Sequence, residues 1–199
     1  IAYWLGGKAI DSFLNQRISD VADIGGGLTC GDTDRFVRRW PEVEFCKSGF
    51  DFQAIADAAN SMHKWFPFNR GGDYRKWYGN HDYLINWEND GEEIVNTGKS
   101  FPRMRKYYFQ PSVSCSGITS GSIPFRYYPH GFVVDVNTRA CFFPKLGVEL
   151  AVLGFGNSCV SQHLVAALNP TLAFNAGELG SLPFDHSIDL DRFSSIATS

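Results

Sequence analysis

The most informative stretch of the chain is residues 63–80, HKWFPFNRGGDYRKWYGN. It combines five basic or imidazole side chains with six aromatic rings, and the pair Gly71-Gly72 permits a bend that folds the rings of one half against those of the other. Cations that contact phosphates, interleaved with rings that stack on sugars and bases, are typical of nucleic-acid-binding surfaces. The same alternation also fits a strand whose rings face the core. The stretch therefore predicts either a nucleic-acid-binding surface or a core strand.

Length and composition are those of a globular protein. The 199 residues suffice for one domain, with 44% hydrophobic and 20% charged side chains. No apolar run approaches the ~18 residues of a membrane span, and the N-terminus lacks the pattern of a signal peptide. The five cysteines are odd in number, widely spaced and without close His or Cys neighbours. This argues against a disulfide framework and a zinc site, so we expect a cytoplasmic protein with buried free thiols and no membrane partner.

The charge of the chain is distributed unevenly. Its net charge is −3, which alone argues weakly against a nucleic-acid partner. Residues 60–130, however, carry 9 Lys or Arg and 6 Asp or Glu, whereas acidic side chains are in excess in residues 1–59 and 131–199. The sequence thus predicts a basic face on a mildly acidic body.

Short β-prone runs separated by Gly, Pro and Ser fill residues 107–143. Such spacing is typical of a small antiparallel sheet and not of βαβ units. Residues 171–184 are apolar enough to pack on the core. We therefore expect an α+β fold, in which a small, curled, mainly antiparallel β-sheet has flanking helices. Periodicity places the other elements, with strands expected at residues 17–24, 42–46 and 82–87 and helices at residues 9–14, 52–62 and 160–168.

No set of residues matches a complete active site. Four glycines between residues 25 and 31 precede a helix start capped by Asp32 or Thr33, but they fit neither GxxxxGK[ST] nor GxGxxG. The histidines are scattered, and GxSxG does not occur. Residues 169–172, NPTL, lack the second proline and the aromatic of the loop with which amino-methyltransferases hold a flipped adenine, and we interpret them as a helix stop. A binding surface is therefore the remaining expectation.

Several blocks of sequence, in the same order, resemble one family. The blocks are Tyr3-Trp4-Leu5, Ile18-Ser19-Asp20-Val21-Ala22-Asp23-Ile24, Gly27-Leu28-Thr29, Gly31-Asp32-Thr33-Asp34-Arg35-Phe36, Lys64-Trp65-Phe66-Pro67-Phe68-Asn69, Arg75-Lys76-Trp77-Tyr78-Gly79-Asn80, Asn86-Trp87-Glu88-Asn89-Asp90-Gly91, Leu168-Asn169-Pro170-Thr171-Leu172-Ala173-Phe174 and Leu182-Pro183-Phe184. They resemble the PglX-type adenine-specific DNA methyltransferases of bacteriophage-exclusion (BREX) systems, which are related to single-chain restriction-modification enzymes.

In that family the catalytic core, with its S-adenosylmethionine site, lies N-terminal to the matching region. The resemblance implies that residues 1–199 are a single target-recognition domain, a fragment of a longer methyltransferase that is non-catalytic by itself and holds no cofactor. Its function would be sequence-specific recognition of duplex DNA, while the parent enzyme methylates adenine with S-adenosylmethionine. The implied partners are double-stranded DNA, the parent's methyltransferase domain and other subunits of the phage-defence system. The absence of an initiator Met fits an excised piece.

The candidate DNA-binding residues fall into two groups. Asn69, Asn80 and His81 are candidates for contacts with base edges, and loops at residues 96–106 and 116–122 are further places to expect base reading. The candidate phosphate contacts are the basic side chains Lys64, Arg70, Arg75, Lys76, Arg103, Arg105 and Lys106.

A different class of function is also open. The chain could be a protein-interaction module, in which three tryptophans, Trp65, Trp77 and Trp87, form an exposed patch that docks a defence-complex subunit or a phage inhibitor.

Overall fold

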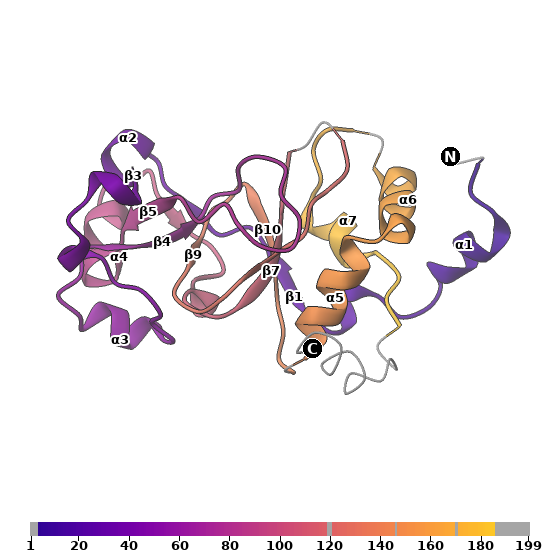
Figure 1. Cartoon of the computed structure of the whole chain (residues 1–199), viewed down its shortest axis with the longest axis horizontal. Helices are drawn as coiled ribbons and strands as arrows, with labels where there is room; N and C mark the ends of the chain where they lie inside the picture. The colour runs from indigo at the N-terminus through magenta and orange to yellow at the C-terminus, as the bar shows by residue number, and fades with distance from the viewer. Residues whose placement is uncertain (1–3, 119–120, 146, 170, 186–199) are drawn as a thin grey trace.

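The computed structural model describes residues 4–118, 121–145, 147–169 and 171–185. Within them the chain forms a mixed α+β fold of three small, mostly antiparallel sheets and seven α-helices, which confirms the expected fold class. The molecule is elongated, and Figure 1 shows two groups of elements side by side along its long axis. Each group has its own main hydrophobic core.

The first group is built on a sheet with strand order β3-β5-β4-β9. Strand β4 pairs antiparallel with β5 and parallel with β9. The core of this group is aromatic, and Phe36, Phe66, Phe68 and Trp87 are completely buried in it. Its elements are α2 (Thr33–Phe36), β3 (Val37–Arg39), α3 (Ile55–Ala59), β4 (Trp65–Asn69), β5 (Tyr83–Asn86), α4 (Glu88–Val95) and β9 (Val133–Val134).

The second group is built on an antiparallel sheet with strand order β1-β10-β7-β8. Helices α5 and α6 pack against its apolar side chains, and Leu182 and Phe184 are buried in the same core. Residues 174–184 therefore pack on the core as expected, whereas Leu172 is exposed. The elements are β1 (Asp23–Gly25), β7 (Ser112–Ser116), β8 (Arg126–Tyr128), β10 (Thr138–Phe142), α5 (Val148–Gly156), α6 (Cys159–Leu168) and α7 (Ala176–Gly180).

The remaining elements are short. Strands β2 (Leu28–Thr29) and β6 (Phe101–Pro102) form a two-stranded sheet. Helix α1 (Gly7–Ser12) overlaps the helix expected at residues 9–14 and lies at the far right in Figure 1. The expected helix at residues 52–62 is present as the shorter α3.

Polar side chains fix the ends of two expected helices. The Oδ1 of Asp32 accepts a hydrogen bond from the N–H of Arg35 at 3.1 Å, so Asp32 caps α2 as expected. Ser158 caps α6 in the same way through the N–H of Ser161. Helix α6 ends at Leu168, with Asn169 as its C-cap, which confirms the helix stop.

Two predicted strands are wrong. Residues 17–24 contain a 3₁₀ turn at Ile18–Asp20; Arg17 forms only an isolated bridge with Pro183, and strand β1 begins at Asp23. Residues 42–46 run from the end of the 3₁₀ turn Trp40–Glu42 into the 3₁₀ turn Phe45–Lys47. In both places a carboxylate accepts a hydrogen bond from the backbone N–H three residues earlier, Asp20 from Arg17 and Glu42 from Arg39, each at 2.8 Å. This local bond closes a turn and overrides the alternating pattern.

The five cysteines are free thiols. Cys30, Cys115 and Cys141 are buried, whereas Cys46 and Cys159 are exposed, so the expected burial holds for three of them. Burial raises the pKa of Cys115 to about 12, which keeps this thiol protonated and unreactive.

Among the described residues, no single helix is long and apolar enough to cross a membrane. Helices α5 and α6 meet that test of length and composition only as a pair, and a 73° bend separates them.

Candidate nucleic-acid interface

The connection between β4 and β5, residues 70–82, is called here the 70–82 loop. Its strands belong to the first group, but the loop packs on the second. The N–H of Trp77 donates to the carbonyl oxygen of Phe125 at 2.8 Å, and the N–H of Tyr127 donates to the carbonyl oxygen of Trp77 at 2.8 Å. Trp77 thereby pairs with β8 in a parallel bridge opposite Arg126. The loop spans the junction of the two groups.

A buried arginine holds the loop from beneath. Arg126 on β8 is completely buried. Its guanidinium donates to the carbonyl oxygen of Arg75 at 3.2 Å, to the Oγ of Ser116 at 3.1 Å and to the hydroxyl of Tyr128 at 3.3 Å. Within the described part of the chain no carboxylate forms an ion pair with it. Its charge is therefore satisfied by neutral oxygens, one of which belongs to the backbone of the loop.

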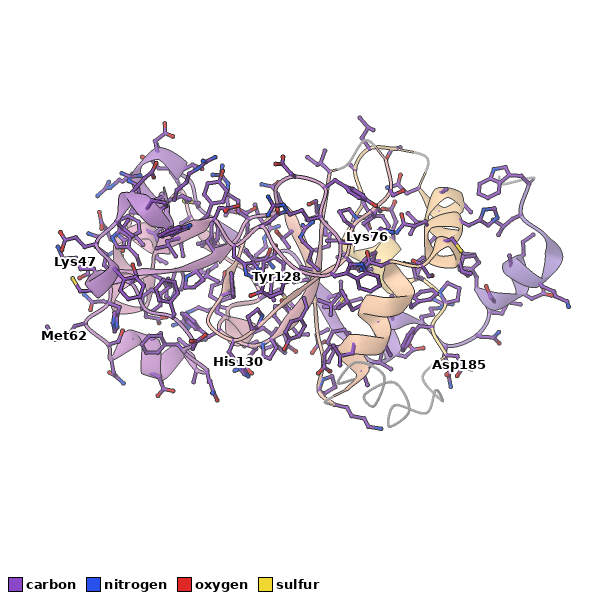
Figure 2. The ribbon with its side chains drawn as sticks, viewed as in Figure 1. Lys47, Met62, Lys76, Tyr128, His130 and Asp185 are labelled. Carbon is purple, nitrogen blue, oxygen red and sulfur yellow. The ribbon has the colours of Figure 1, made fainter. Side chains whose placement is uncertain are left out.

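A lysine anchors the same loop to α5. The Nζ of Lys76 donates to the carbonyl oxygen of Asn157 at 2.9 Å, and Asn157 is the C-cap of α5. A cation is favourable there because unpaired carbonyl groups give the helix C-terminus a partial negative charge. Figure 2 shows Lys76 next to α5, in the second group. The ammonium group of Lys76 therefore attaches the loop to the end of α5.

The backbone of the loop is specialised. Gly71, Gly72 and Gly79 have φ values of 84°, 135° and 124°, which side chains disfavour, and Trp77 and Asn80 have φ values of 74° and 60°. The Nδ2 of Asn80 donates to the carbonyl oxygen of Asp73 at 2.9 Å and fixes the turn from inside. Unlike Gly and Asn, Trp rarely adopts a left-handed backbone conformation. The two backbone hydrogen bonds to residues in and next to β8 hold Trp77 in it.

The result is a fixed backbone with exposed rings. Tyr74, Trp77 and Tyr78 are 58%, 52% and 61% exposed, and Arg75 is exposed between them. The rings of residues 65–68 do not pack against them, because Phe66 and Phe68 lie in the core of the first group. The core-strand interpretation thus holds for the first half of residues 63–80, whereas the rings of the second half are exposed.

The imidazole of His81 lies inside the base of the loop. Its ring centroid is 4.4 Å from that of Tyr78, 5.0 Å from that of Tyr128 and 4.9 Å from that of Phe132. Its Nε2 is buried, with no hydrogen-bond partner among the described residues. Burial, aided by the charge of Arg126, lowers the pKa of His81, so the ring is neutral at pH 7.

The ten predicted site residues therefore lie in different parts of the molecule. Arg70, Arg75, Lys76, Asn80 and His81 share the 70–82 loop or its base, and Arg75 presents an exposed side chain there. Asn80 is almost entirely buried and His81 is partly buried.

Asn69 is completely buried, and its Nδ2 donates to the Oγ of Ser114 at 2.9 Å. It contributes no exposed surface.

The second basic cluster belongs to another surface. Arg103 is exposed, and Arg105 forms an ion pair with Asp90. The Nζ of Lys106 lies 4.5 Å from the ring centroid of Tyr107. Lys106 lines a pocket of about 370 Å³ together with His130. The structure does not bring this cluster into the 70–82 loop.

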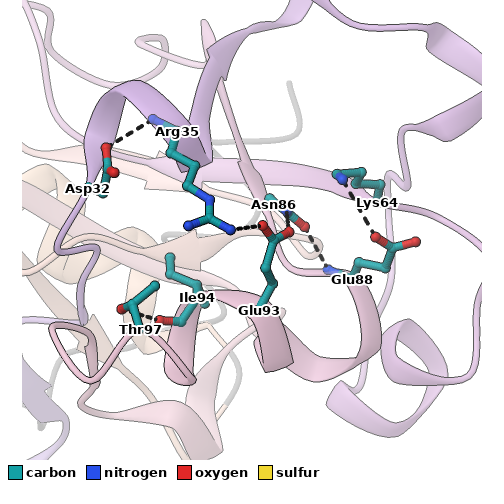
Figure 3. Close-up of polar contacts among 8 residues, drawn as sticks. All are labelled: Asp32, Arg35, Lys64, Asn86, Glu88, Glu93, Ile94 and Thr97. Atoms are coloured by element: carbon teal, nitrogen blue, oxygen red, sulfur yellow. Dashed lines mark hydrogen bonds and ion pairs between the residues drawn. The ribbon is translucent and has the colours of Figure 1, made fainter.

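Two carboxylates of helix α4 form ion pairs with cations from other segments, as Figure 3 shows. The Nζ of Lys64 lies 3.7 Å from the Oε2 of Glu88. The Nη2 of Arg35 donates a hydrogen bond to the Oε1 of Glu93 at 2.6 Å, and this hydrogen bond lowers the pKa of the Glu93 carboxyl group. The predicted contact Lys64 is thus partly neutralised.

Two corrections concern side chains whose burial the sequence did not reveal. Trp87 is completely buried, so the expected exposed patch of Trp65, Trp77 and Trp87 does not form. Arg126 was expected only as part of a strand, although it positions the loop. Alternation places Arg126 and Tyr128 on the same face of β8, but no sequence signal shows that this face is buried.

The described residues contain no group of three His, Cys, Asp or Glu side chains that could hold a metal ion. The base-reading loop expected at residues 116–122 is only partly visible, because residues 119–120 lie outside the described part.

Comparison with known proteins connects the chain to methyltransferases. No protein-family model matches it. It is 35% identical over 192 residues to adenine-specific methyltransferase PglX of Lacticaseibacillus casei (strain Zhang). It is 36% identical over 186 residues to adenine-specific methyltransferase BrxX of Escherichia coli O9:H4 (strain HS).

Both matches cover 92% of this chain but only 16% and 15% of the relatives. The chain is therefore homologous to a short part of the PglX and BrxX methyltransferases and spans about one-sixth of their length.

Proposed function

We propose that the chain is the DNA-recognition part of an adenine-specific DNA methyltransferase of a phage-defence system. In this proposal catalysis and the S-adenosylmethionine site belong to other parts of the parent enzyme, and these residues hold the duplex. The relatives are adenine-specific methyltransferases, and an enzyme that acts on adenine within DNA needs a surface that grips the duplex.

The observation that carries the proposal is the 70–82 loop. Its backbone is fixed by Arg126, Lys76 and the bonds of Trp77, while Tyr74, Trp77, Tyr78 and the cation of Arg75 face outward. A preformed surface loses little conformational entropy on binding. Arginine matches phosphate oxygens with its planar fork, and exposed rings pack on sugars and bases. The loop thus offers both kinds of contact at one place.

Titration of the chain with a short DNA duplex at several salt concentrations tests the proposal. The logarithm of the binding constant should fall by about 0.9 for each phosphate contacted per log unit of salt. Absence of binding at low salt, or binding that does not depend on salt, would contradict it.

A matched pair of variants locates the surface. Arg75→Ala should weaken binding about tenfold, because a charge-assisted contact is lost, and should lower the salt slope by about 0.9. Arg103→Ala removes the same charge from the other basic surface and should leave affinity nearly unchanged. The opposite ranking would move the interface to residues 103–106.

One observation favours protein docking as a second candidate. Tyr74, Trp77 and Tyr78 are large rings exposed on one short loop, and such rings are enriched among residues that dominate protein interfaces. The partner would be another defence-system subunit or a phage inhibitor. This alternative would be favoured if the chain bound a partner protein with an affinity that does not depend on salt and showed no affinity for DNA.

A further inference from the structure

Three arginines meet at the base of the 70–82 loop. Arg39 ends β3 and lies opposite Tyr83 in the pairing of β3 with β5. Arg70 directly follows β4. Their guanidinium carbons lie 5.9 Å and 5.2 Å from the ring centroid of Tyr83, and that of Arg38 lies 5.9 Å from the ring centroid of Trp65. Two strands, β3 with Arg38 and Arg39 and β4 with Arg70 just after its end, thus bring three cations together on aromatic supports.

These side chains line an open pocket of about 460 Å³, called here the arginine pocket. Its lining also includes the residues Thr33, Asp34, Val37 and Glu42. The carboxylate of Glu42 is engaged by the backbone N–H of Arg39 at 2.8 Å. The pocket therefore holds three cations and two carboxylates.

The described part of the chain gives none of these three guanidinium groups an ion-pair partner. Its four ion pairs use Arg35, Lys47, Lys64 and Arg105 instead. Asp135 is close enough to feel the charge of Arg70, but burial is the dominant effect and raises the pKa of this carboxyl group. The cations of the arginine pocket are thus left for a ligand of opposite charge.

The orientation of Arg38 is already set. Its Nη1 donates to the carbonyl oxygens of Asp34 at 2.5 Å and of Val37 at 2.7 Å. A guanidinium group held by one edge or stacked on a ring keeps its other N–H groups available for a planar, two-pronged contact. Tetrahedral oxyanions of phosphate are the ligands that such forks match.

We propose that the arginine pocket binds a phosphate group, and that in the complex with DNA this group is a phosphodiester of the backbone. Only the identity of the source rests on the proposed function, since the phosphate chemistry follows from the pocket itself. Arg70 begins the loop that presents Arg75 and the exposed rings. The pocket is therefore a second anchor, next to that surface, that sets the position of the backbone.

Charge-removing variants test the proposal. Arg39→Gln and Arg70→Gln should each weaken duplex binding about tenfold and lower the salt slope by about 0.9. The control is Lys47→Gln, which also removes one positive charge. Lys47 lies at the left end of the molecule in Figure 2, and the affinity of this variant for the duplex should stay within about twofold of wild type. Circular dichroism confirms the fold of each variant, and Arg39→Gln, on an exposed side chain, serves if Arg70→Gln does not fold.

A titration with inorganic pyrophosphate, followed by amide NMR, separates this proposal from the proposed function. The amide resonances of Arg38, Arg39, Arg70 and Tyr83 should shift in the wild type and not in Arg39→Gln. Such shifts without any duplex binding would support the pocket as a site for a free phosphate ligand and contradict the DNA proposal. Duplex binding with both arginine variants equal to Lys47→Gln, or no pyrophosphate shift at these residues, would overturn the pocket.

Discussion

Among single residues, Arg126 has the largest part in positioning the 70–82 loop. A charged side chain without a carboxylate is costly to bury, and it is tolerated where every donor finds an oxygen. Each of the three guanidinium nitrogens of Arg126 finds one acceptor, on three segments: Arg75 in the loop, Ser116 at the end of β7 and Tyr128 on β8. Only a branched, planar donor reaches all three. The position of the loop therefore depends on arginine and not on positive charge alone.

Arg126→Lys tests this dependence. Lysine keeps the charge but cannot bond all three acceptors, so the free energy of unfolding should fall by about 1–3 kcal/mol. Urea denaturation measures it. Arg103→Lys, at an exposed position, is the matched control and should stay within about 0.5 kcal/mol of wild type. Equal stability of Arg126→Lys and wild type would contradict the role of the fork.

His81 makes a pH-dependent contribution. Burial lowers its pKa in the folded protein below the unfolded value of about 6.5, so the unfolded chain takes up a proton more readily. The stabilisation from neutral His81 is present above pH 6.5 and is lost as pH falls through the folded pKa, at up to about 1.4 kcal/mol per pH unit.

His81→Phe should therefore reduce the loss of stability between pH 7 and pH 5, because Phe also fits among Tyr78, Tyr128 and Phe132 and carries no proton. Urea denaturation at several pH values gives the comparison. An unchanged pH dependence would show that His81 is not the group involved.

At the scale of elements, local signals were readable in the sequence and distant ones were not. The Asp32 cap of α2, the alternating β5 and the end of α6 at Asn169 each depend on neighbouring residues, and all were predicted. The 70–82 loop is held by partners far along the chain. Lys76 and Asn157 are 81 positions apart, and Arg75 and Arg126 are 51 apart. The residue types of the loop thus predicted a surface, but its support required the structure.

Two glycines allow a comparison of element packing. Gly154 lies in α5 with no atom near an added Cβ, so Gly154→Ala should raise the free energy of unfolding by about 0.5–1 kcal/mol. A Cβ at Gly27 would overlap the carbonyl oxygen of Val134, where β9 passes β2, so Gly27→Ala should lower it. Thermal and urea denaturation measure both. Destabilisation by Gly154→Ala, or a neutral Gly27→Ala, would contradict this packing.

Across the described residues, the molecule has two main hydrophobic cores, and the 70–82 loop links the groups built on them. The sequence predicted one basic face, but the excess of basic side chains in residues 60–130 does not gather on one face. Lys64 and Arg105 are paired with carboxylates, and residues 103–106 occupy a surface of their own. The arginines without ion pairs near the 70–82 loop include Arg38 and Arg39, which precede the basic third of the sequence. Charge counting therefore could not show which surface carries the arginines without ion pairs.

We propose that duplex DNA contacts the chain at the 70–82 loop. Amide NMR of the chain during titration with a short duplex tests this contact, because it reports on the backbone N–H groups of all parts of the chain at once. We predict that the resonances with the largest shifts belong to residues 70–82, followed by those of Arg38 and Arg39. Shifts confined to residues 103–111, or no shifts at low salt, would contradict the account.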